Sequence, residues 1–218
     1  MTDFDLLIFD MDGVLVDTTE CHRRAYDDLW QLAGVAGPAY EQIAGRKTTE
    51  VVAEFTAALN PSPEQIAEWV VFKQQRARRY LATEKISFHD SAECIGRLGR
   101  LNGNRLRLAI GTGASRETTS MVLGRFGWGE AFSIIVTGED VVEGKPAPEI
   151  YLAAMERAGV SPQRTLIIED SHAGLTAAVA SRAYTASVRS GIKTEDRRFI
   201  GSFPDVRSLL AKLSYTEQ

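Results

Sequence analysis

Two pairs of carboxylates stand out in this sequence, because each pair brings two like charges close together. Asp10 and Asp12 are separated by one residue, and Glu169 and Asp170 are adjacent. Such charges repel in a partly buried site unless a cation or a proton joins them. A hard cation such as Mg²⁺ prefers oxygen ligands and would offset this repulsion. A single Asp in such a place is often a helix cap or a turn residue, but two acidic pairs together favour a metal site.

The same carboxylates, with a threonine and a lysine, could transfer a phosphoryl group. That reaction needs a nucleophile, neutralisation of charge on the phosphoryl oxygens and a group that handles the proton. Asp10 fits the nucleophile, because a carboxylate needs no deprotonation at neutral pH, and Asp12 fits the general acid/base. Thr112 lies between two glycines and could present a hydroxyl and backbone amides to an anion, while Lys145 could aim an ammonium at it. Taken singly, Thr112 could also be an ordinary turn residue and Lys145 a solvated surface lysine.

The apolar pattern predicts the elements that position these residues. Residues 6–9 are typical of a buried parallel strand, so Asp10 falls at the carboxyl end, where open α/β sheets bind ligands. Residues 18–82 show only helical periodicity. Further strand-length runs lie at residues 106–110, 132–136, 166–168 and 183–188, and helical stretches lie near 115–126, 147–159 and 172–181. We therefore expect an α/β protein with a Rossmann-like parallel sheet core flanked by helices and a helical insertion after its first strand.

Composition and charge are typical of a soluble globular protein. Of the 218 residues, 44% are hydrophobic and 25% are charged, and the net charge is −4, so no nucleic acid and no membrane partner is expected. No charged and apolar leader is visible, and no apolar stretch approaches the roughly 20 residues that cross a bilayer, so we expect a cytoplasmic protein. Cys21 and Cys94 should be free thiols in helices. We expect a monomer or a weak dimer, and we expect the polar stretch 189–202 to be the most mobile part, ahead of a final helix at 206–213.

Four motifs in order resemble the haloacid dehalogenase superfamily, within the group that includes β-phosphoglucomutase and the phosphoglycolate-type phosphatases. They are DxDGxLxD at 10–17, a strand that ends in Thr112, GKPxPEIY at 144–151 and IIEDSxAG at 167–174. The resemblance spans nearly the whole chain. It implies an α/β core domain of residues 1–17 and 85–218, with a helical cap domain of the C1 type at residues 18–84.

The resemblance also implies a role for each motif residue. Asp10 would be the nucleophile, and Asp12 would be the general acid/base and a metal ligand through its backbone carbonyl. Thr112 and Lys145 would bind the transferring phosphoryl group. Glu169 and Asp170 would hold Mg²⁺, directly or through water.

Two namesake activities of the superfamily are not expected here. True dehalogenases act without the metal and lack the second aspartate, whereas this chain has Asp12 and the Glu169-Asp170 pair. Phosphonatase relatives use a cap lysine as a Schiff-base nucleophile. Lys47 is the only lysine early in the insertion, and nothing around it is apolar enough to suggest a strongly lowered pKa.

The insertion supplies candidate substrate ligands. Thr18 and His22 lie one helical turn apart and resemble the start of the mutase cap, where a threonine and a histidine sit near the cleft. Arg46 and Lys47 lie in a loop that resembles the specificity loop but departs from the mutase order of glycine, any residue, serine and arginine, and both could hold an anion. Further candidates are Arg76, which could equally belong to a solvated helix face, and Gly113, Ser115 and Arg116 after the strand that ends in Thr112. His89 is expected to be a linker residue.

These features predict a magnesium-dependent phosphatase of small phosphorylated metabolites, of the sugar phosphate or phosphoglycolate type, that works through an aspartyl-phosphate. A β-phosphoglucomutase-like mutase is the alternative, because both enzymes form the same intermediate and differ in whether a sugar hydroxyl or water attacks it. A catalytically idle sensor of phosphorylated metabolites fits less well, because the chain keeps both Asp10 and Asp12.

Overall fold

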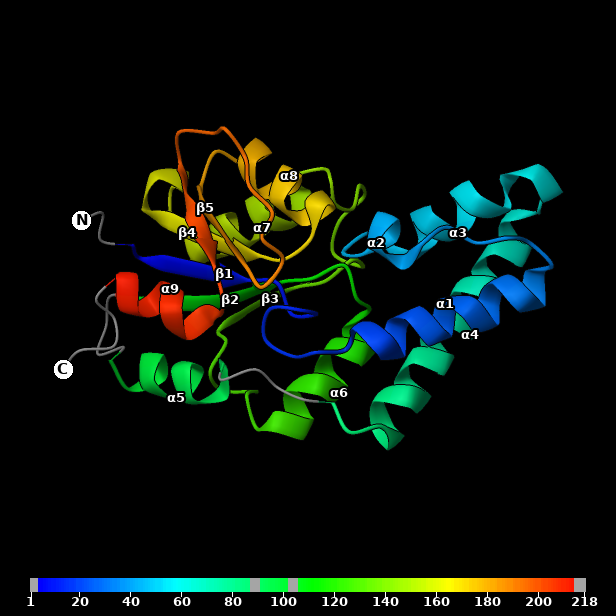
Figure 1. Ribbon diagram of the computed structural model, residues 1–218, viewed down its shortest axis with the longest axis horizontal. Coiled ribbons are helices and arrows are strands. Elements are labelled where there is room, and N and C mark those ends of the chain that lie inside the picture. Colours follow the sequence, from blue (N-terminus) through cyan, green and yellow to red (C-terminus); the bar gives the residue numbers. More distant parts are fainter. Residues whose placement is uncertain (1–3, 87–90, 102–105, 214–218) are drawn as a thin grey trace.

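The computed structural model describes residues 4–86, 91–101 and 106–213. In Figure 1 these residues form a sheet with helices on both faces and, beside it, a block of helices. The expectation that His89 is a linker residue falls on a position outside the described residues.

Six parallel strands form the sheet, in the order β3-β2-β1-β4-β5-β6. Strand β1 lies between β2 and β4, and Phe9 at its end is opposite Ile110 and Ile168. Residues that follow these three strands therefore meet at one edge of the sheet, and the predicted α/β class is confirmed. The strands are β1 (Leu6–Phe9), β2 (Arg107–Gly111), β3 (Ile134–Val136), β4 (Thr165–Glu169), β5 (Tyr184–Val188) and β6 (Phe199–Phe203).

Helices bury both faces of the sheet, which explains the unbroken apolar run in β1. Leu7 and Phe9 belong to a core shared with α5, α6 and α9, whereas Leu6 and Ile8 belong to a core shared with α7 and α8 (Figure 1). A strand that is buried on both faces is apolar at successive positions instead of alternating. The helices are α5 (Ser91–Leu101), α6 (Arg116–Phe126), α7 (Glu149–Ala158), α8 (His172–Ala180) and α9 (Val206–Lys212), with a 3-10 helix η2 (Pro162–Arg164) before β4.

The sequence predicts a mobile polar stretch at 189–202, but the last four of these residues lie in a strand. Strand β6 lies there and pairs in parallel with β5 at the edge of the sheet. Because Gly201 and Ser202 interrupt the apolar residues of β6, no apolar run of strand length is visible in the sequence. Helix α5 was not predicted either, although Ile95 and Leu98 recur with helical spacing on its buried side.

Four helices occupy the insertion between β1 and α5: α1 (Thr19–Ala33), α2 (Tyr40–Ile43), α3 (Thr48–Thr56) and α4 (Pro63–Thr83), with a 3-10 helix η1 (Ala57–Leu59) after α3. Helix α1 ends at Gly34, whose φ of 70° is accessible to glycine at little cost, and Ser62 caps α4 by accepting from the Gln65 amide at 3.2 Å. The insertion has a hydrophobic core of its own, made of Tyr26, Leu29, Trp30, Ile43, Val51, Val52 and Val70. A separate core is what a distinct cap domain requires, and the boundaries at residues 18 and 84 stay a prediction.

The structure also tests the predictions for the two cysteines and for membrane-spanning segments. Cys21 in α1 and Cys94 in α5 are buried, and neither forms a disulfide, as predicted. In the part of the chain that the structure describes, no helix has both the length and the apolar character to cross a bilayer.

Candidate active site

Three carboxylates converge at the carboxyl ends of β1 and β4. Asp10 follows β1, and its amide donates to the Ile168 carbonyl at 3.0 Å, which ties the end of β1 to β4. Oxygen atoms of Asp10, Glu169 and Asp170 all lie within 4.8 Å of one another. Because parallel strands place their carboxyl ends together, this convergence follows from the sheet order itself.

Lys145 bridges two of these carboxylates. Its side chain is fully buried, and Nζ lies 2.5 Å from Asp10 Oδ1 and 2.6 Å from Glu169 Oε1. Burial alone would lower the pKa of Lys145, but the charges of Asp10 and Glu169 outweigh it and raise the pKa well above its ordinary value. Lys145 is therefore a permanent cation beside Asp10, where a transferring phosphoryl group would need one.

Glu169 is held by donors on both of its oxygens. Oε1 accepts from Lys145 and from the hydroxyl of Tyr151, and Oε2 accepts from the Asp170 amide at 3.0 Å and from Ser171 Oγ at 3.2 Å. A Cβ on Gly174 would lie 1.9 Å from Oε1, so the first turn of α8 must carry glycine there. Sequence reasoning missed Tyr151, although it is the last residue of the GKPxPEIY motif.

The acidic cluster carries an electrostatic cost that a divalent cation would offset. Burial raises the pKa of Asp10 to about 8, and Lys145 opposes the rise. Burial, followed by the charges of Glu169 and Asp10, raises the pKa of Asp170 well above its ordinary value. Gly13, at φ 86°, leaves room for Asp170, because a Cβ there would lie 1.9 Å from Oδ2. Clustered oxygen donors that are unfavourable as bare anions fit a hard divalent cation.

Asp12 faces the insertion and is contacted from α1. The Thr18 hydroxyl donates to Asp12 Oδ1, and His22 Nε2 lies 3.4 Å from the same oxygen. Burial would raise the pKa of Asp12, but His22, Thr18 and Lys73 outweigh it and lower the pKa. The side chain of Asp12 is 21% exposed, compared with 4% for Asp10, so Asp12 is the carboxylate with more access to solvent.

Lys73 extends this chain of contacts and was missed as a site residue. Its side chain is buried, and Nζ lies 3.2 Å from His22 Nδ1 and 4.1 Å from the centre of the Tyr26 ring. An ammonium can only donate, so Nδ1 of His22 is the acceptor when Lys73 is charged. Lys73 follows Val70 by three residues and precedes Ala77 by four, so helical spacing with these buried positions could have identified it.

A cleft that is partly open to solvent lies between the sheet edge and the insertion. Thr112 lies on its floor, with its amide donating to the Val136 carbonyl at 3.0 Å and its hydroxyl accepting from the Ala114 amide at 3.1 Å. The sheet side of the cleft is lined by Asp10, Asp12, Thr112, Gly113 and Ala114, and the insertion side by His22, Tyr26, Tyr40, Ile43, Gly45, Arg46, Thr48 and Lys73.

Three of the predicted cationic ligands are engaged elsewhere. Arg46 lines the cleft, but its guanidinium lies 2.5 Å from a Glu54 carboxylate oxygen. Lys47 Nζ donates to the backbone carbonyls of two core residues instead of pointing into the cleft. Arg76 lies away from the cleft, where it pairs with Asp28 at 2.6 Å on the outer side of the insertion.

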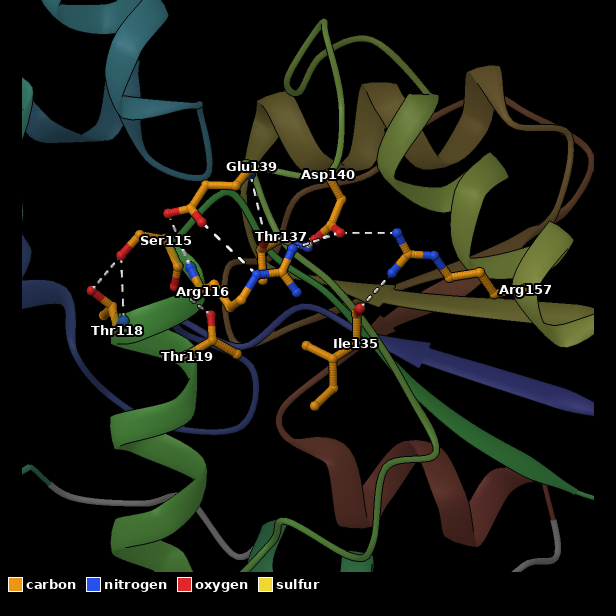
Figure 2. Close-up of polar contacts among 9 residues, drawn as sticks. All are labelled: Ser115, Arg116, Thr118, Thr119, Ile135, Thr137, Glu139, Asp140 and Arg157. Atoms are coloured by element: carbon orange, nitrogen blue, oxygen red, sulfur yellow. Dashed lines mark hydrogen bonds and ion pairs between the residues drawn. The ribbon is translucent and has the colours of Figure 1, made fainter. Parts of the chain in front are cut away.

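Ser115 and Arg116 also lie outside the cleft that contains Asp10. Ser115 caps α6 by accepting from the Thr118 amide at 3.3 Å. Figure 2 shows Arg116 beside Asp140, which accepts from it at 2.8 Å and from Arg157 at 2.9 Å. The structure thus brings together the predicted core residues with Thr18 and His22, and it does not bring Lys47, Arg76, Ser115 or Arg116 to them.

Comparisons with known proteins place this geometry in a family. The profile of the haloacid dehalogenase-like hydrolases matches residues 4–182. Protein CbbY from Rhodobacter capsulatus is 32% identical over 186 residues, which span 80% of this chain and 81% of that protein. A phosphorylated carbohydrates phosphatase from Thermotoga maritima is 30% identical over 178 residues, with 80% of each protein covered. The crystal structure of a CbbY variant from Rhodobacter sphaeroides in complex with xylulose-(1,5)bisphosphate has a TM-score of 0.76 at 27% identity and covers 92% of this chain and 93% of that chain.

All four motifs predicted to carry the chemistry lie inside the matched residues, from Asp10 to Gly174. The similarity covers the insertion as well as the sheet. The chain therefore belongs to the haloacid dehalogenase-like hydrolases and is a phosphoric monoester hydrolase.

Proposed function

We propose that this enzyme is a magnesium-dependent phosphatase of small phosphorylated sugars, and that Asp10 forms an aspartyl-phosphate during turnover. The observation that carries the proposal is the arrangement of Asp10, which is held by Lys145 at one oxygen and lies beside a second carboxylate, Asp12, at the floor of a cleft. A nucleophile, a fixed cation and a proton carrier around one space are the requirements for phosphoryl transfer.

Each catalytic residue has a defined role in the proposed reaction. Lys145 fixes Oδ1 of Asp10, so Oδ2 is the attacking oxygen, and the ammonium neutralises charge on the phosphoryl group. The Thr112 hydroxyl accepts from the Ala114 amide and can still donate its own proton to a phosphoryl oxygen. Asp12 gives a proton to the sugar oxygen that leaves as Asp10 attacks phosphorus, and it takes a proton back from the water that hydrolyses the aspartyl-phosphate.

Asp10, Asp170 and the backbone carbonyl of Asp12 are the proposed magnesium ligands. Glu169 would act on the ion through water, because its oxygens already accept from Lys145, Tyr151 and Ser171. Bound magnesium would neutralise charge on the phosphoryl oxygens. The fit rests on the crowding of Asp10 and Asp170 described above.

A sugar phosphate suits the insertion side of the cleft. Tyr26, Tyr40 and Thr48 offer aromatic faces and hydroxyls, and Lys73 offers a buried ammonium that contacts His22 and Tyr26. Such a mixture can hold a polyol and a second anionic group. The names of the relatives agree with this class, since one is a phosphorylated carbohydrates phosphatase and another was crystallised with a sugar bisphosphate.

Water is favoured over a sugar hydroxyl as the final acceptor. A mutase must hold the second phosphate of its intermediate on the cap while the first one is transferred. The two cations of the predicted specificity loop have other partners, because Arg46 pairs with Glu54 and Lys47 binds backbone carbonyls. Lys73 then remains on the insertion side of the cleft for a second phosphate, which suits binding of a bisphosphate substrate but provides less than the set of ligands that a mutase intermediate requires.

Phosphate release over a substrate panel tests the proposal. The panel is xylulose 1,5-bisphosphate, glucose 1-phosphate, phosphoglycolate and a nucleoside monophosphate, each with Mg²⁺ and with a chelator. We expect release from the sugar phosphates that needs Mg²⁺ and falls by about 10³-fold or more in Asp10→Asn. Formation of glucose 6-phosphate faster than free phosphate would favour the mutase, and binding without turnover would favour the sensor.

A further inference from the structure

The first turn of α3 is bound to the backbone of the core segment that leads to Lys145. Lys47 Nζ donates to the Val141 carbonyl at 2.8 Å and to the Val142 carbonyl at 3.1 Å. Glu50 Oε1 accepts from the Gly144 amide at 2.6 Å. The first turn of α3 thus places an ammonium against two carbonyl oxygens and a carboxylate against one amide N–H. Each charged group meets a backbone dipole of the opposite polarity.

The core segment 137–144 is itself fixed, so it offers a firm surface for this contact. Asp140 Oδ2 accepts from the Thr137 amide at 2.8 Å, and Oδ1 of the same carboxylate accepts from Arg116 and Arg157 (Figure 2). Glu149 at the start of α7 accepts from the Val142 amide at 2.9 Å. These contacts hold the segment to α6 and α7, so movement of the insertion would break the contacts of Lys47 and Glu50 first.

Gly144 connects the contact with α3 to the catalytic residue Lys145. It is followed directly by Lys145, whose ammonium holds Asp10. A Cβ on Gly144 would lie 2.5 Å from the Cβ of Lys47 and 3.2 Å from the carboxylate oxygens of Glu50. The close approach of α3 to this segment therefore requires glycine at the residue before Lys145.

Neither residue is suited to bind the substrate in this arrangement. Lys47 is absent from the lining of the cleft around Asp10, and its ammonium is already used by two carbonyls. A carboxylate such as Glu50 would repel a phosphorylated substrate, so its place near Lys145 needs another explanation.

We infer that Lys47 and Glu50, with the backbone of Val141, Val142 and Gly144, form a cap latch that holds the insertion closed over the cleft and keeps Lys145 in place during phosphoryl transfer. Lys47 and Glu50 are positioning residues in this inference, not substrate ligands. Its kinetic part rests on the proposed function, and its structural part does not.

Amide exchange tests the cap latch without any turnover. In the intact protein, hydrogen exchange of the Gly144 amide is followed by NMR in wild type, Glu50→Ala, Glu50→Gln and the control Glu68→Ala, which changes an exposed carboxylate on α4. We expect exchange to be about tenfold or more faster in Glu50→Ala, and near the wild-type rate in Glu50→Gln, whose amide oxygen can still accept, and in the control. Equal exchange in wild type and Glu50→Ala would overturn the inference.

Kinetics with two substrates separate a latch from a ligand. Lys47→Met, Lys47→Arg and the control Lys85→Met, an exposed lysine on the return from α4, are assayed with the best sugar phosphate of the panel and with phenyl phosphate. We expect Lys47→Met to lower kcat about tenfold for both substrates with little change in KM, and Lys47→Arg to recover most of it. An increase in KM for the sugar phosphate alone would make Lys47 a substrate ligand and overturn the inference. If neither wild type nor any variant turns over any substrate, the proposed function is wrong. The amide exchange experiment still tests the cap latch in that case.

Discussion

Replacing Lys73 with methionine should make the protein more stable and less active. The side chain is 5% exposed, and burial lowers the pKa of its ammonium from the ordinary 10.5 to about 8, with Asp12 opposing the fall. At about 1.4 kcal/mol for each pKa unit, the charged form costs about 3 kcal/mol in the folded state. Methionine fills a similar volume without a charge.

The net gain is smaller, because lysine also makes favourable contacts. The ammonium lies over the Tyr26 ring and contacts His22, and loss of these interactions removes about 1–2 kcal/mol. We therefore expect the free energy of unfolding to rise by about 1–2 kcal/mol at pH 7, which corresponds to a Tm about 2–8 °C higher for a chain of this size. Urea denaturation and thermal scans measure both quantities.

The difference in unfolding free energy between Lys73→Met and wild type should depend on pH. Between pH 8 and about 10.5 the unfolded chain keeps the Lys73 proton that the folded chain has lost, so wild-type stability gains with rising pH from this group. The methionine variant lacks this gain. Its advantage in unfolding free energy should be full below about pH 8 and should shrink as the pH rises toward 10.

Activity should change in the opposite direction, because the variant removes the buried cation of the cleft. We expect KM for a sugar phosphate to rise about tenfold, and KM for phenyl phosphate, which lacks the part that would reach Lys73, to change little. A variant that is less stable than wild type at pH 7, or one that keeps the wild-type KM for the sugar phosphate, would refute the reasoning.

Three further predictions concern the acidic cluster. Asp10→Asn should lose turnover without losing stability, because burial disfavours the charge that the substitution removes; the phosphate assay and a thermal scan check this together, and a large fall in Tm would contradict it. Tyr151→Phe removes one donor to Glu169 and should lower the unfolding free energy by about 1–3 kcal/mol in denaturation, with wild-type stability as the contrary result. Millimolar Mg²⁺ should raise the Tm of wild type by several degrees and that of Asp170→Ala much less, and equal shifts would place the ion elsewhere.

Topology explains why the core of the site was predictable from the sequence. Asp10 and Glu169 end neighbouring parallel strands, so once β1 and β4 were identified, their carboxylates had to share an edge. Tyr151 was not predictable in this way, because its contact with Glu169 depends on how α7 packs against the sheet. Strand β6 was missed because a half-buried edge strand shows no unbroken apolar run.

The cations of the insertion show more clearly which roles cannot be predicted from the sequence. Arg46, Lys47, Lys73 and Arg76 all read as positive charges near a cleft that binds anions, but tertiary packing assigns them different tasks. Arg46 and Arg76 pair with carboxylates of the insertion itself, and Lys47 binds the core backbone. Sequence spacing alone distinguishes only Lys73, through its place on the buried side of α4.

A cation that binds a substrate should be recognisable in the free protein, because its buried charge lacks full compensation there. Arg46 and Arg76 are partly exposed, and each pairs with a carboxylate that compensates its charge. Lys73 is buried against His22 and an aromatic ring, which leaves its charge poorly compensated. An anionic group in the cleft would supply the missing compensation, so binding should be strongest for substrates that carry a second negative charge at the distance of Lys73 from Asp10. We therefore expect a sugar bisphosphate to be a better substrate than the matching monophosphate, and the difference should vanish in Lys73→Met.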